Sequence, residues 1–553
     1  MTRVSAISKY ETDSASAVAT SEIEKSFQRG LWSGFLNSAK RFPERPAIVA
    51  EGQVWSYDQL RELACSIAAT IQKRPEFSAT PVTAVFAYRS TTAFAGVLGA
   101  LLSGNGYVPL NRTFPEGRSK VMLERSQARS LIVDAKSLLQ VSTLLEGARE
   151  PLLVILPDVV DTDALKAAWP VHEFIGARDL QSAAEWREPA RETDSLAYLL
   201  FTSGSTGTPK GVAVAQRNVL AFVDYMVERY EVTENDRLSQ MFDMTFDLSA
   251  FDMFVAWERG ACVCCPSQKE LIKPDSFIKN NHLTMWFSVP STAVFMKQLG
   301  LLKAGRYPEL RVSLFCGEPL PASSIQAWSE AAPNSIVENL YGPTELTIAC
   351  TLYRWDAQRS PGESEMGIVP IGFAYPGMNY LVVDGDLNEV GPGEEGELLM
   401  NGPQMSLGYW NDPKKTSEAF LIPPGQREIY YRTGDRVRRP RAGGPLIHLG
   451  RIDSQIKVLG HRVELGEIEA AVRKHCGSDA VVATGWPRTS SGYGGVEVFI
   501  EGKTENNQLR EAVQAELPEY MVPRKFHFRE KLPRNSNGKL DRAAIAKSLD
   551  GGS

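Results

Sequence analysis

The chain has 553 residues, of which 43% are apolar and 23% are charged, and its formal net charge is −6. These values are typical of a globular protein and exclude a disordered chain, a collagen-like fibre and a disulfide-rich scaffold. A mildly acidic chain is also a poor candidate for coating nucleic acid or for a polybasic membrane anchor. The length corresponds to about three or four domains of ordinary size.

The seven cysteines fit neither a disulfide framework nor a zinc site. Those at 262, 264 and 265 share one apolar, strand-like run, and no second Cys or His pair follows at zinc-ligand spacing. We therefore expect buried, reduced thiols. The N-terminal residues lack the apolar core of a signal peptide, and the longest apolar stretches, such as 93–102, are too short to cross a bilayer. The expectation is a cytoplasmic protein.

Strand and helix patterns alternate after a polar, Ser-rich stretch at 1–25, which we expect to be a flexible N-terminus. Ser56 precedes one helical pattern in the position of an N-cap. Helices are predicted at 31–42, 57–71 and 92–103, and strands at 47–49, 54–56, 82–88, 107–110, 130–133 and 152–156. This alternation indicates an α/β fold with layers around a mostly parallel sheet.

Two later regions have a different character. Residues 381–449 are rich in Gly and Pro, which predicts a small β-rich subdomain of hairpins. Beyond about residue 454, helices at 465–475 and 507–517 and strands at 480–484, 496–500 and 525–529 predict a compact α+β unit. We expect a large core at 26–452, with layered α/β subdomains and the β-rich subdomain, and a smaller C-terminal domain at 453–553.

The most informative segment follows an apolar strand pattern at 196–201. Residues 202–208 are all Ser, Thr or Gly, and Pro209, Lys210 and Gly211 follow. The glycines permit backbone geometry that exposes N–H groups, the hydroxyls can donate to anionic oxygens, and Lys210 adds a positive charge. The segment is not a Walker P-loop, because Pro209 and Gly211 occupy the positions of its Gly and its Ser or Thr. It predicts a loop that binds a polyphosphate.

Residues 202–211 resemble the phosphate-loop signature of the ANL superfamily, which comprises acyl-CoA synthetases, luciferase-like enzymes and the adenylation domains of nonribosomal peptide synthetases. Similar motifs follow in the family's order at 341–345, 396–409, 431–435, 450–457, 517–523 and 535–541. The resemblance covers about residues 30–545 and is closest to amino-acid adenylation domains. It implies the ANL fold and two steps: a carboxylate attacks the α-phosphate of ATP to give an acyl-AMP and pyrophosphate, and a thiol then attacks the acyl-AMP.

The resemblance also implies roles in ATP binding. Tyr341 would offer an aromatic face to adenine, Asp435 would accept the ribose hydroxyls, Arg451 would lie by the ribose and phosphate, and Thr344 would contact the α-phosphate. Glu345 would help to hold Mg²⁺, which prefers oxygen ligands. The contacts to the other phosphates would come from Thr202, Ser203, Gly204, Ser205, Thr206, Gly207 and Lys210.

Lys539 would bridge the carboxylate and the α-phosphate and offset the charge that builds in the transition state. The implied catalytic set is Lys539, Lys210, Thr202 and Glu345. The resemblance implies that 453–553 is a mobile lid, and Asp453 resembles the hinge between the two units. Lys457 and residues 460–464 resemble elements that reach the site in the thioester-forming pose. Without the resemblance, Asp435 could be only a turn residue and Lys539 a solvated surface charge.

The motif at 244–252 matches the family's substrate pocket, and Asp247 aligns with the carboxylate that pairs the substrate's α-amino group. Because a buried carboxylate needs a cation partner, Asp247 favours an amino acid over a fatty or aryl acid, although it could instead cap a helix. The other aligned positions are Leu248, Phe251, Phe287, Leu314, Cys316, Leu340, Ile348 and Ala349. With only Asp247 and Lys539 charged and two Phe rings filling volume, we expect a small, apolar side chain.

This pocket resembles that of stand-alone L-prolyl-AMP ligases, so proline or a close analogue ranks first. Residues 314–321 also resemble D-alanine:carrier ligases, in which a Cys lies beside the substrate, so Ala, D-Ala, Cys or another small residue stays open.

Only 12 residues follow Asp541, and the sequence shows no carrier or condensation domain. We expect an enzyme that works alone and loads a separate phosphopantetheinylated carrier protein, unless the chain is an excised domain. An acyl-CoA ligase is a second class, which Asp247 disfavours. A binding protein that kept the fold is a third, but such a protein would be expected to have lost Lys539, Glu345 or Asp435.

Overall fold

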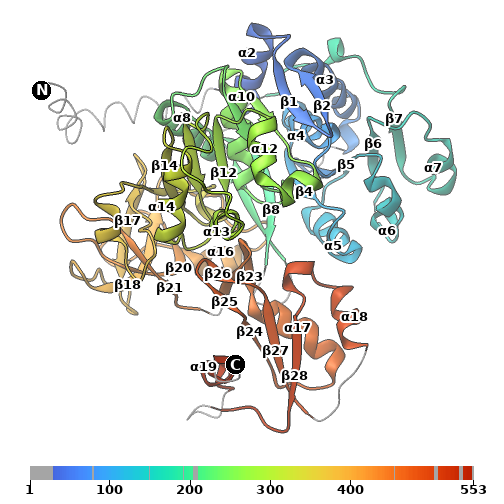
Figure 1. Cartoon of the computed structure of the whole chain (residues 1–553). Coiled ribbons are helices and arrows are strands. Elements are labelled where there is room, and N and C mark those ends of the chain that lie inside the picture. The colour runs from blue at the N-terminus through green and yellow to red at the C-terminus, as the bar shows by residue number, and fades with distance from the viewer. Residues whose placement is uncertain are drawn as a thin grey trace, which may run out of the picture.

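The computed structural model describes residues 29–77, 80–148, 150–190, 192, 194–203, 209–453, 455–502, 508–534 and 540–550. The predicted flexible N-terminus at 1–25 lies outside them. A large body of sheets and helices occupies the upper part of Figure 1, and the C-terminal segment forms a smaller unit below it. No described helix is long and apolar enough to span a membrane.

A seven-stranded sheet contains the strands predicted between residues 82 and 156. Its strand order is β7-β6-β5-β3-β4-β8-β9, and all neighbours are parallel except β8 and β9. The strands are β3 (Val82–Phe86), β4 (Gly106–Leu110), β5 (Ser130–Val133), β6 (Leu153–Leu156), β7 (Glu173–Gly176), β8 (Leu196–Thr202) and β9 (Lys210–Ala215). Thr202 and Lys210 pair across β8 and β9, so both ends of the phosphate-loop segment lie at one edge of the sheet.

A nine-stranded sheet lies beside it, in the order β16-β15-β14-β13-β12-β10-β11-β1-β2. Its strands are β1 (Pro46–Ala50), β2 (Gln53–Ser56), β10 (Arg237–Ser239), β11 (Cys262–Cys264), β12 (Met285–Ser288), β13 (Val312–Phe315), β14 (Ile336–Tyr341), β15 (Thr351–Arg354) and β16 (Phe373–Ala374). The central strands are parallel. The cysteine-rich run is the buried strand β11, and its thiols are free, as predicted.

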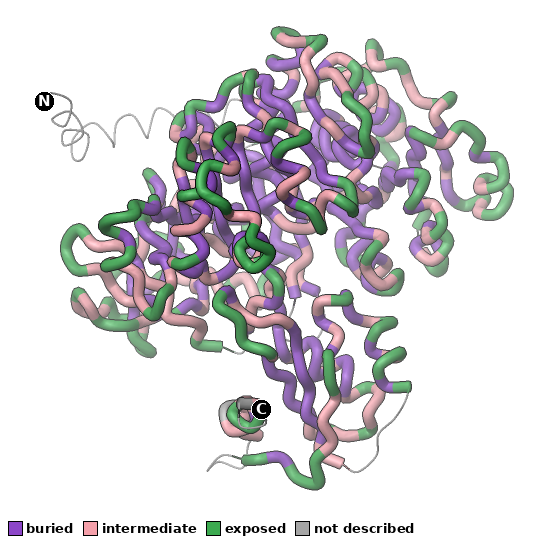
Figure 2. The backbone as a smooth tube through the Cα atoms, in the orientation of Figure 1, coloured by how far each residue is buried: buried purple, intermediate pink, exposed green. Residues whose placement is uncertain are grey.

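Helices connect the strands and pack into a core that spans both sheets, seen as the buried centre of the tube in Figure 2. The predicted cap of α3 (Tyr57–Gln72) is confirmed, because the Ser56 side chain accepts a hydrogen bond from the Gln59 N–H in a capping box. Further helices of the body include α2 (Ser33–Arg41), α4 (Thr91–Ser103), α5 (Glu116–Ser126), α8 (Gln216–Arg229), α10 (Ala256–Arg259), α12 (Pro274–Asn280), α13 (Pro290–Gln298) and α14 (Ala322–Ala331).

The β-rich region predicted at 381–449 is a five-stranded sheet. It contains β17 (Asn379–Val383), β18 (Glu395–Asn401), β19 (Phe420–Leu421), β20 (Tyr430–Arg438) and β21 (Ile447–Arg451), all paired antiparallel. The pairing of β20 with β21 sets Asp435 opposite Arg451. Two residues with predicted roles at the nucleotide are thus cross-strand neighbours.

The C-terminal segment is α+β, as predicted. It contains β24 (Val481–Gly485), β27 (Val496–Glu501), β28 (Lys525–Arg529), β25 (Arg488–Thr489), β26 (Gly492–Tyr493), α17 (Leu465–Cys476), α18 (Leu509–Gln514) and α19 (Arg542–Asp550). α18 ends at Gln514, before the predicted end at residue 517.

One hairpin in this segment was not predicted. It pairs β22 (Gln455–Val458) with β23 (His461–Glu464) through a two-residue turn. Leu459 and Gly460 have φ of 48° and 85°, so both lie in the left-handed region that such tight hairpin turns require. We call this element the β22–β23 hairpin. It points from the C-terminal segment into the body.

Candidate active site

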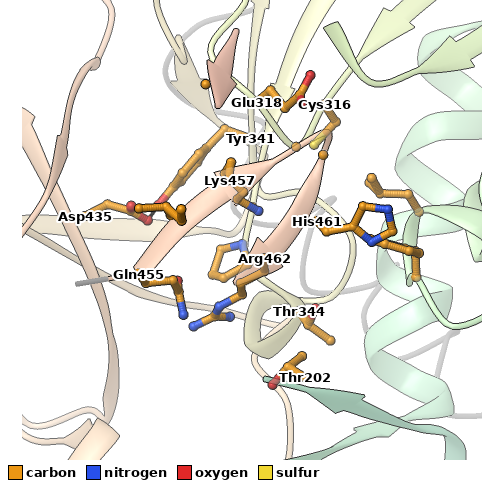
Figure 3. Close-up of a pocket in the computed structure, with 18 of the residues that line it drawn as sticks. Thr202, Cys316, Glu318, Tyr341, Thr344, Asp435, Gln455, Lys457, His461 and Arg462 are labelled. Atoms are coloured by element: carbon orange, nitrogen blue, oxygen red, sulfur yellow. Dashed lines mark hydrogen bonds between the residues drawn. The ribbon is translucent and has the colours of Figure 1, made fainter. Parts of the chain in front are cut away.

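A cavity of about 430 Å³ lies where the carboxyl ends of parallel strands in the body meet the β22–β23 hairpin (Figure 3). Tyr341 ends β14, and Cys316 follows the end of the neighbouring parallel strand β13. Ligand sites in α/β sheets form at such edges because loops and side chains converge there. Residues with predicted roles at the nucleotide and at the amino acid line this one cavity: Thr202, Ser203, Asp247, Leu248, Cys316, Leu340, Tyr341, Thr344, Asp435 and Arg451. Asp453, the predicted hinge, and Lys457, predicted for the thioester step, line it too.

One end of the cavity is organised around Asp435. Its Oδ2 accepts a hydrogen bond from the Tyr341 hydroxyl at 2.6 Å, and its Oδ1 lies 3.0 Å from Arg451 Nη1 and 3.1 Å from His448 Nε2. Burial alone would raise the pKa of Asp435, but the hydrogen bond with His448 and the charge of Arg451 outweigh it and hold the pKa below its usual range. Asp435 is therefore a fixed anion at the hydroxyl of Tyr341. We call this the nucleoside side.

The opposite end contains the described part of the phosphate loop. Gly204, Ser205, Thr206 and Gly207 lie outside the described residues, but Thr202, Ser203 and Lys210 flank them. Lys210 Nζ donates to the Tyr409 hydroxyl at 3.1 Å and lies 3.4 Å from Glu345 Oε1. Burial lowers the pKa of Lys210 although Glu345 opposes this. We call this end the phosphate side.

Glu345 is completely buried on the phosphate side. Its Oε2 accepts a hydrogen bond from Arg462 Nη1 at 2.8 Å, and its Oε1 accepts one from the Tyr409 hydroxyl at 2.8 Å. Burial would raise its pKa, but the charges of Arg462 and Lys210 hold the pKa below its usual range. The described residues form no cluster of three metal-binding side chains. A single carboxylate fits Mg²⁺ held mainly by phosphate oxygens, although Arg462 engages Glu345 here.

The β22–β23 hairpin also occupies other groups of the phosphate side. Ser203 Oγ donates to the carbonyl oxygen of Arg462 at 2.9 Å and accepts from the Glu464 N–H at 3.2 Å. Two residues predicted to serve ATP and its metal, Ser203 and Glu345, are therefore engaged by the hairpin in this pose.

Lys457 points from β22 into the cavity (Figure 3). Burial, reinforced by the nearby charge of Arg462, lowers its pKa. Beside it, His461 stacks on Tyr520 with ring centroids 3.6 Å apart and meets the edge of Phe246 at 4.8 Å. Burial followed by the charge of Lys457 lowers the pKa of His461 to about 3, so its ring is neutral.

The C-terminal segment is further attached to the body by a buried ion pair. Arg118 Nη1 on α5 lies 2.6 Å from Glu467 Oε1 on α17. The two residues are 349 positions apart. This ion pair and the hairpin's contacts with Ser203 and Glu345 hold the C-terminal segment against the body. We call this arrangement the docked pose.

The candidate amino-acid pocket begins at Asp247. Its Oδ2 accepts a hydrogen bond from the Ile348 N–H at 3.3 Å, and burial raises its pKa to about 6. Phe251 and Phe287 pack edge to face with ring centroids 5.0 Å apart. They are buried, as are Leu314, Ile348 and Ala349, but none of these five predicted pocket residues lines the cavity.

The sequence did not reveal every polar group at this site. Glu318 and His448 line the cavity, and the Tyr409 hydroxyl donates to Glu345, and none of the three was predicted. Tyr409 lies inside a segment with family resemblance, which could have drawn attention to it. Lys457, predicted for the thioester step, and Arg462, in the predicted segment 460–464, also line the cavity. Lys539 lies outside the described residues. Asp453, the predicted hinge, forms an ion pair with Arg451 at 2.7 Å.

Comparisons with known proteins agree with this architecture. A family model described as AMP-binding enzyme matches residues 35–410, and one described as AMP-binding enzyme C-terminal domain matches residues 467–539. An L-proline--[L-prolyl-carrier protein] ligase of Pseudomonas fluorescens is 32% identical over 94% of this chain and 99% of its own length. A D-alanine--D-alanyl carrier protein ligase of Bacillus velezensis is 31% identical over 92% of this chain and 97% of its own.

A solved structure shares the fold. It is the adenylation domain AlmE of Vibrio cholerae in complex with glycyl-adenosine-5'-phosphate. Its TM-score is 0.83 and its sequence is 30% identical, with 94% of this chain and 97% of that chain covered.

Proposed function

The chain belongs to the AMP-binding enzyme family and is an adenylate-forming ligase, and from this premise we propose that it activates a small amino acid and loads it onto a separate carrier protein. The amino-acid carboxylate attacks the α-phosphate of ATP, which forms an aminoacyl-AMP and releases pyrophosphate. The phosphopantetheine thiol of the carrier then attacks the carbonyl carbon, and AMP leaves. The observation that carries the proposal is the buried carboxylate of Asp247 in the same cavity as Tyr341 and Asp435.

In the first step, the nucleoside side holds the adenosine. Tyr341 stacks on adenine, Asp435 accepts the ribose hydroxyls, and Arg451 pairs with the phosphate. Thr344 contacts the α-phosphate at which the bond forms. Phosphoryl transfer depends mainly on position and charge neutralisation, and Lys539 supplies a positive charge between the two reacting anions.

The phosphate side binds the leaving pyrophosphate. Thr202, Ser203 and Lys210 contact its oxygens, together with Gly204, Ser205, Thr206 and Gly207. Glu345 would hold Mg²⁺, which neutralises phosphate charge when bound. Because Arg462 and the hairpin backbone engage Glu345 and Ser203 in the docked pose, we infer that pyrophosphate leaves before the hairpin docks.

In the second step, the docked hairpin brings Lys457 to the cavity. We propose that residues 453–553 act as a mobile lid that turns at Asp453 and presents Lys539 in the first step and Lys457 in the second. Asp453→Pro is accordingly expected to block one step and spare the other.

For the substrate, we propose L-proline or a close analogue. The support is the part of the cavity lined by Asp247, Leu248 and Cys316, and the similarity to the L-proline--[L-prolyl-carrier protein] ligase. Alanine, D-alanine and cysteine are the alternatives, since a D-alanine--D-alanyl carrier protein ligase is almost equally similar.

ATP–pyrophosphate exchange with every proteinogenic amino acid and D-alanine tests the substrate. The highest exchange with proline supports the proposal, and the highest exchange with a charged or large aromatic amino acid contradicts the pocket assignment. Comparing CoA with a holo-carrier protein as the acceptor separates the carrier ligase from an acyl-CoA ligase.

A further inference from the structure

One buried carboxylate of the cavity has no role in the reaction as described so far. Glu318 follows β13 and lines the cavity together with Cys316 and Gly460 at the tip of the hairpin. The residue is 9% exposed. Its Oε2 accepts a hydrogen bond from the Ser291 N–H at 2.8 Å, in the first turn of α13. The body thus fixes one oxygen of Glu318 at a helix N-terminus, where a negative charge is favoured.

The other surroundings of Glu318 come from the hairpin. The backbone N–H of Gly460 and the charge of Lys457 both lie close enough to its carboxylate to act on it electrostatically, and both residues line the cavity with Glu318. Both interactions oppose the rise in pKa that burial causes. Glu318 therefore bridges α13 of the body and the element that carries Lys457.

The tip of the hairpin packs closely against two segments of the body, at Val289 and at Gly317. A Cβ on Gly460 would lie 2.6 Å from Val289 Cγ1, and a Cβ on Gly317 would lie 3.9 Å from the Gly460 carbonyl oxygen. The hairpin tip thus rests directly against the residues that flank Glu318 and α13. The tip therefore leaves no space for a side chain at Gly460.

A buried carboxylate is stable only with donors and opposite charge around it. Withdrawal of the hairpin would remove the Gly460 N–H and the Lys457 charge from Glu318 and leave only the donors of α13. We propose that Glu318 is a positioning residue for the transfer step, which favours the docked pose and holds Lys457 at the cavity. This inference rests on the proposed two-step function.

Glu318→Gln tests the proposal, because it removes the charge and retains an oxygen that can accept from Ser291. We expect single-turnover transfer from preformed aminoacyl-AMP to holo-carrier to slow about tenfold, which corresponds to a lost charged hydrogen bond. ATP–pyrophosphate exchange and its KM for ATP should change less than twofold. Glu309→Gln, which removes an exposed carboxylate from the loop before β13, is the matched control and should change neither step.

A double-variant comparison separates positioning from a general structural role. If Glu318 acts through Lys457, Glu318→Gln should slow transfer little further in a Lys457→Met background. Equal losses in both steps, independent effects of the two substitutions, or an unchanged transfer rate would each overturn the proposal.

Hydrogen–deuterium exchange of the segment 455–464 gives a measurement that needs no catalysis. In the ligand-free protein, Glu318→Gln should accelerate exchange in this segment, and Glu309→Gln should not. Unchanged exchange would contradict the positioning role even if the enzyme activates an amino acid. Failure of the wild-type protein to release pyrophosphate with any amino acid would contradict the proposed function instead.

Discussion

The nucleoside side and the phosphate side of the cavity are organised by different parts of the chain. Asp435 is held by Tyr341, Arg451 and His448, which lie on β14 and β21 of the body. On the phosphate side, body residues Tyr409 and Lys210 contact Glu345, but residues 462–464 of the β22–β23 hairpin also engage Glu345 and Ser203. The contacts described on the nucleoside side come from the body. Some of those on the phosphate side come from the hairpin, which changes position in the proposed mechanism.

This difference separates the effects of substitutions at the two sides. Contacts within the body persist in either pose, so a change on the nucleoside side should impair both steps. Contacts that the lid makes exist in one pose only, so a change there should impair one step. Substitutions on the nucleoside side should therefore slow both steps, whereas substitutions that remove a contact of the lid should slow only one step.

The largest difference between the losses in the two steps is expected for a substitution of Lys539. Lys539→Ala should reduce adenylation about 10³-fold, because the charge that offsets the two reacting anions is lost. Transfer from supplied aminoacyl-AMP should fall far less. ATP–pyrophosphate exchange measures the first step, and single-turnover carrier loading measures the second. Lys531→Ala, at an exposed lysine in the same segment, is the control. Equal losses in both steps would remove Lys539 from this role.

Asp435→Asn should impair both steps about 10²-fold in kcat/KM. The carboxylate is expected to bind the ribose of ATP and of aminoacyl-AMP, and loss of charged hydrogen bonds weakens both complexes. The dependence of exchange on ATP and of transfer on aminoacyl-AMP checks this. A loss in the first step alone would contradict the prediction that substitutions on the nucleoside side impair both steps.

Arg462→Met should slow transfer about tenfold and leave exchange within twofold. Without the guanidinium, buried Glu345 loses its strongest partner in the docked pose, which weakens docking but not ATP binding. Arg488→Met, at an exposed arginine on β25 in the same small sheet, should change neither step. A larger loss in exchange than in transfer would show that Arg462 serves the first step.

Most of the fold was predictable because its signals are local. The strands at Ser130–Val133 and Lys525–Arg529 have the predicted bounds, and Ser56 caps α3, since apolar periodicity and capping residues depend on neighbours in the chain. The β22–β23 hairpin escaped prediction because its turn, Leu459–Gly460, lacks the Asn-Gly or Asp-Gly pair that marks such turns.

The family and the ATP motifs were predictable because each motif is contiguous. The partners of these motifs were not, because they join distant segments: Arg462 meets Glu345 across 117 positions, and Arg118 meets Glu467 across 349. The sequence placed only Asp247 and Lys539 as charges in the substrate pocket. The resemblance implies that Lys457 and residues 460–464 reach the site, but no local pattern indicates that Glu318 lines the same cavity as Lys457.

The last expected effect is a pH dependence of the KM for the amino acid, caused by Asp247 in the same cavity. Its pKa is raised to about 6 by burial, although the N–H of Ile348, the hydroxyl of Thr344 and the charge of Lys457 oppose this. Only the ionised form pairs with a substrate ammonium. The KM for the amino acid should therefore stay constant above pH 7 and rise about tenfold as the pH falls from 8 to 5.

The KM for ATP, measured in the same exchange assays, is the internal control for this titration. Asp435 and Glu345 keep their charges over this range because the pKa of each lies below its usual range. Asp247→Asn should raise the KM for the amino acid at pH 8 and remove its dependence on pH between 8 and 5. A rise below pH 6 that persists in Asp247→Asn would assign the titration to another group and weaken the case for an ammonium-binding carboxylate.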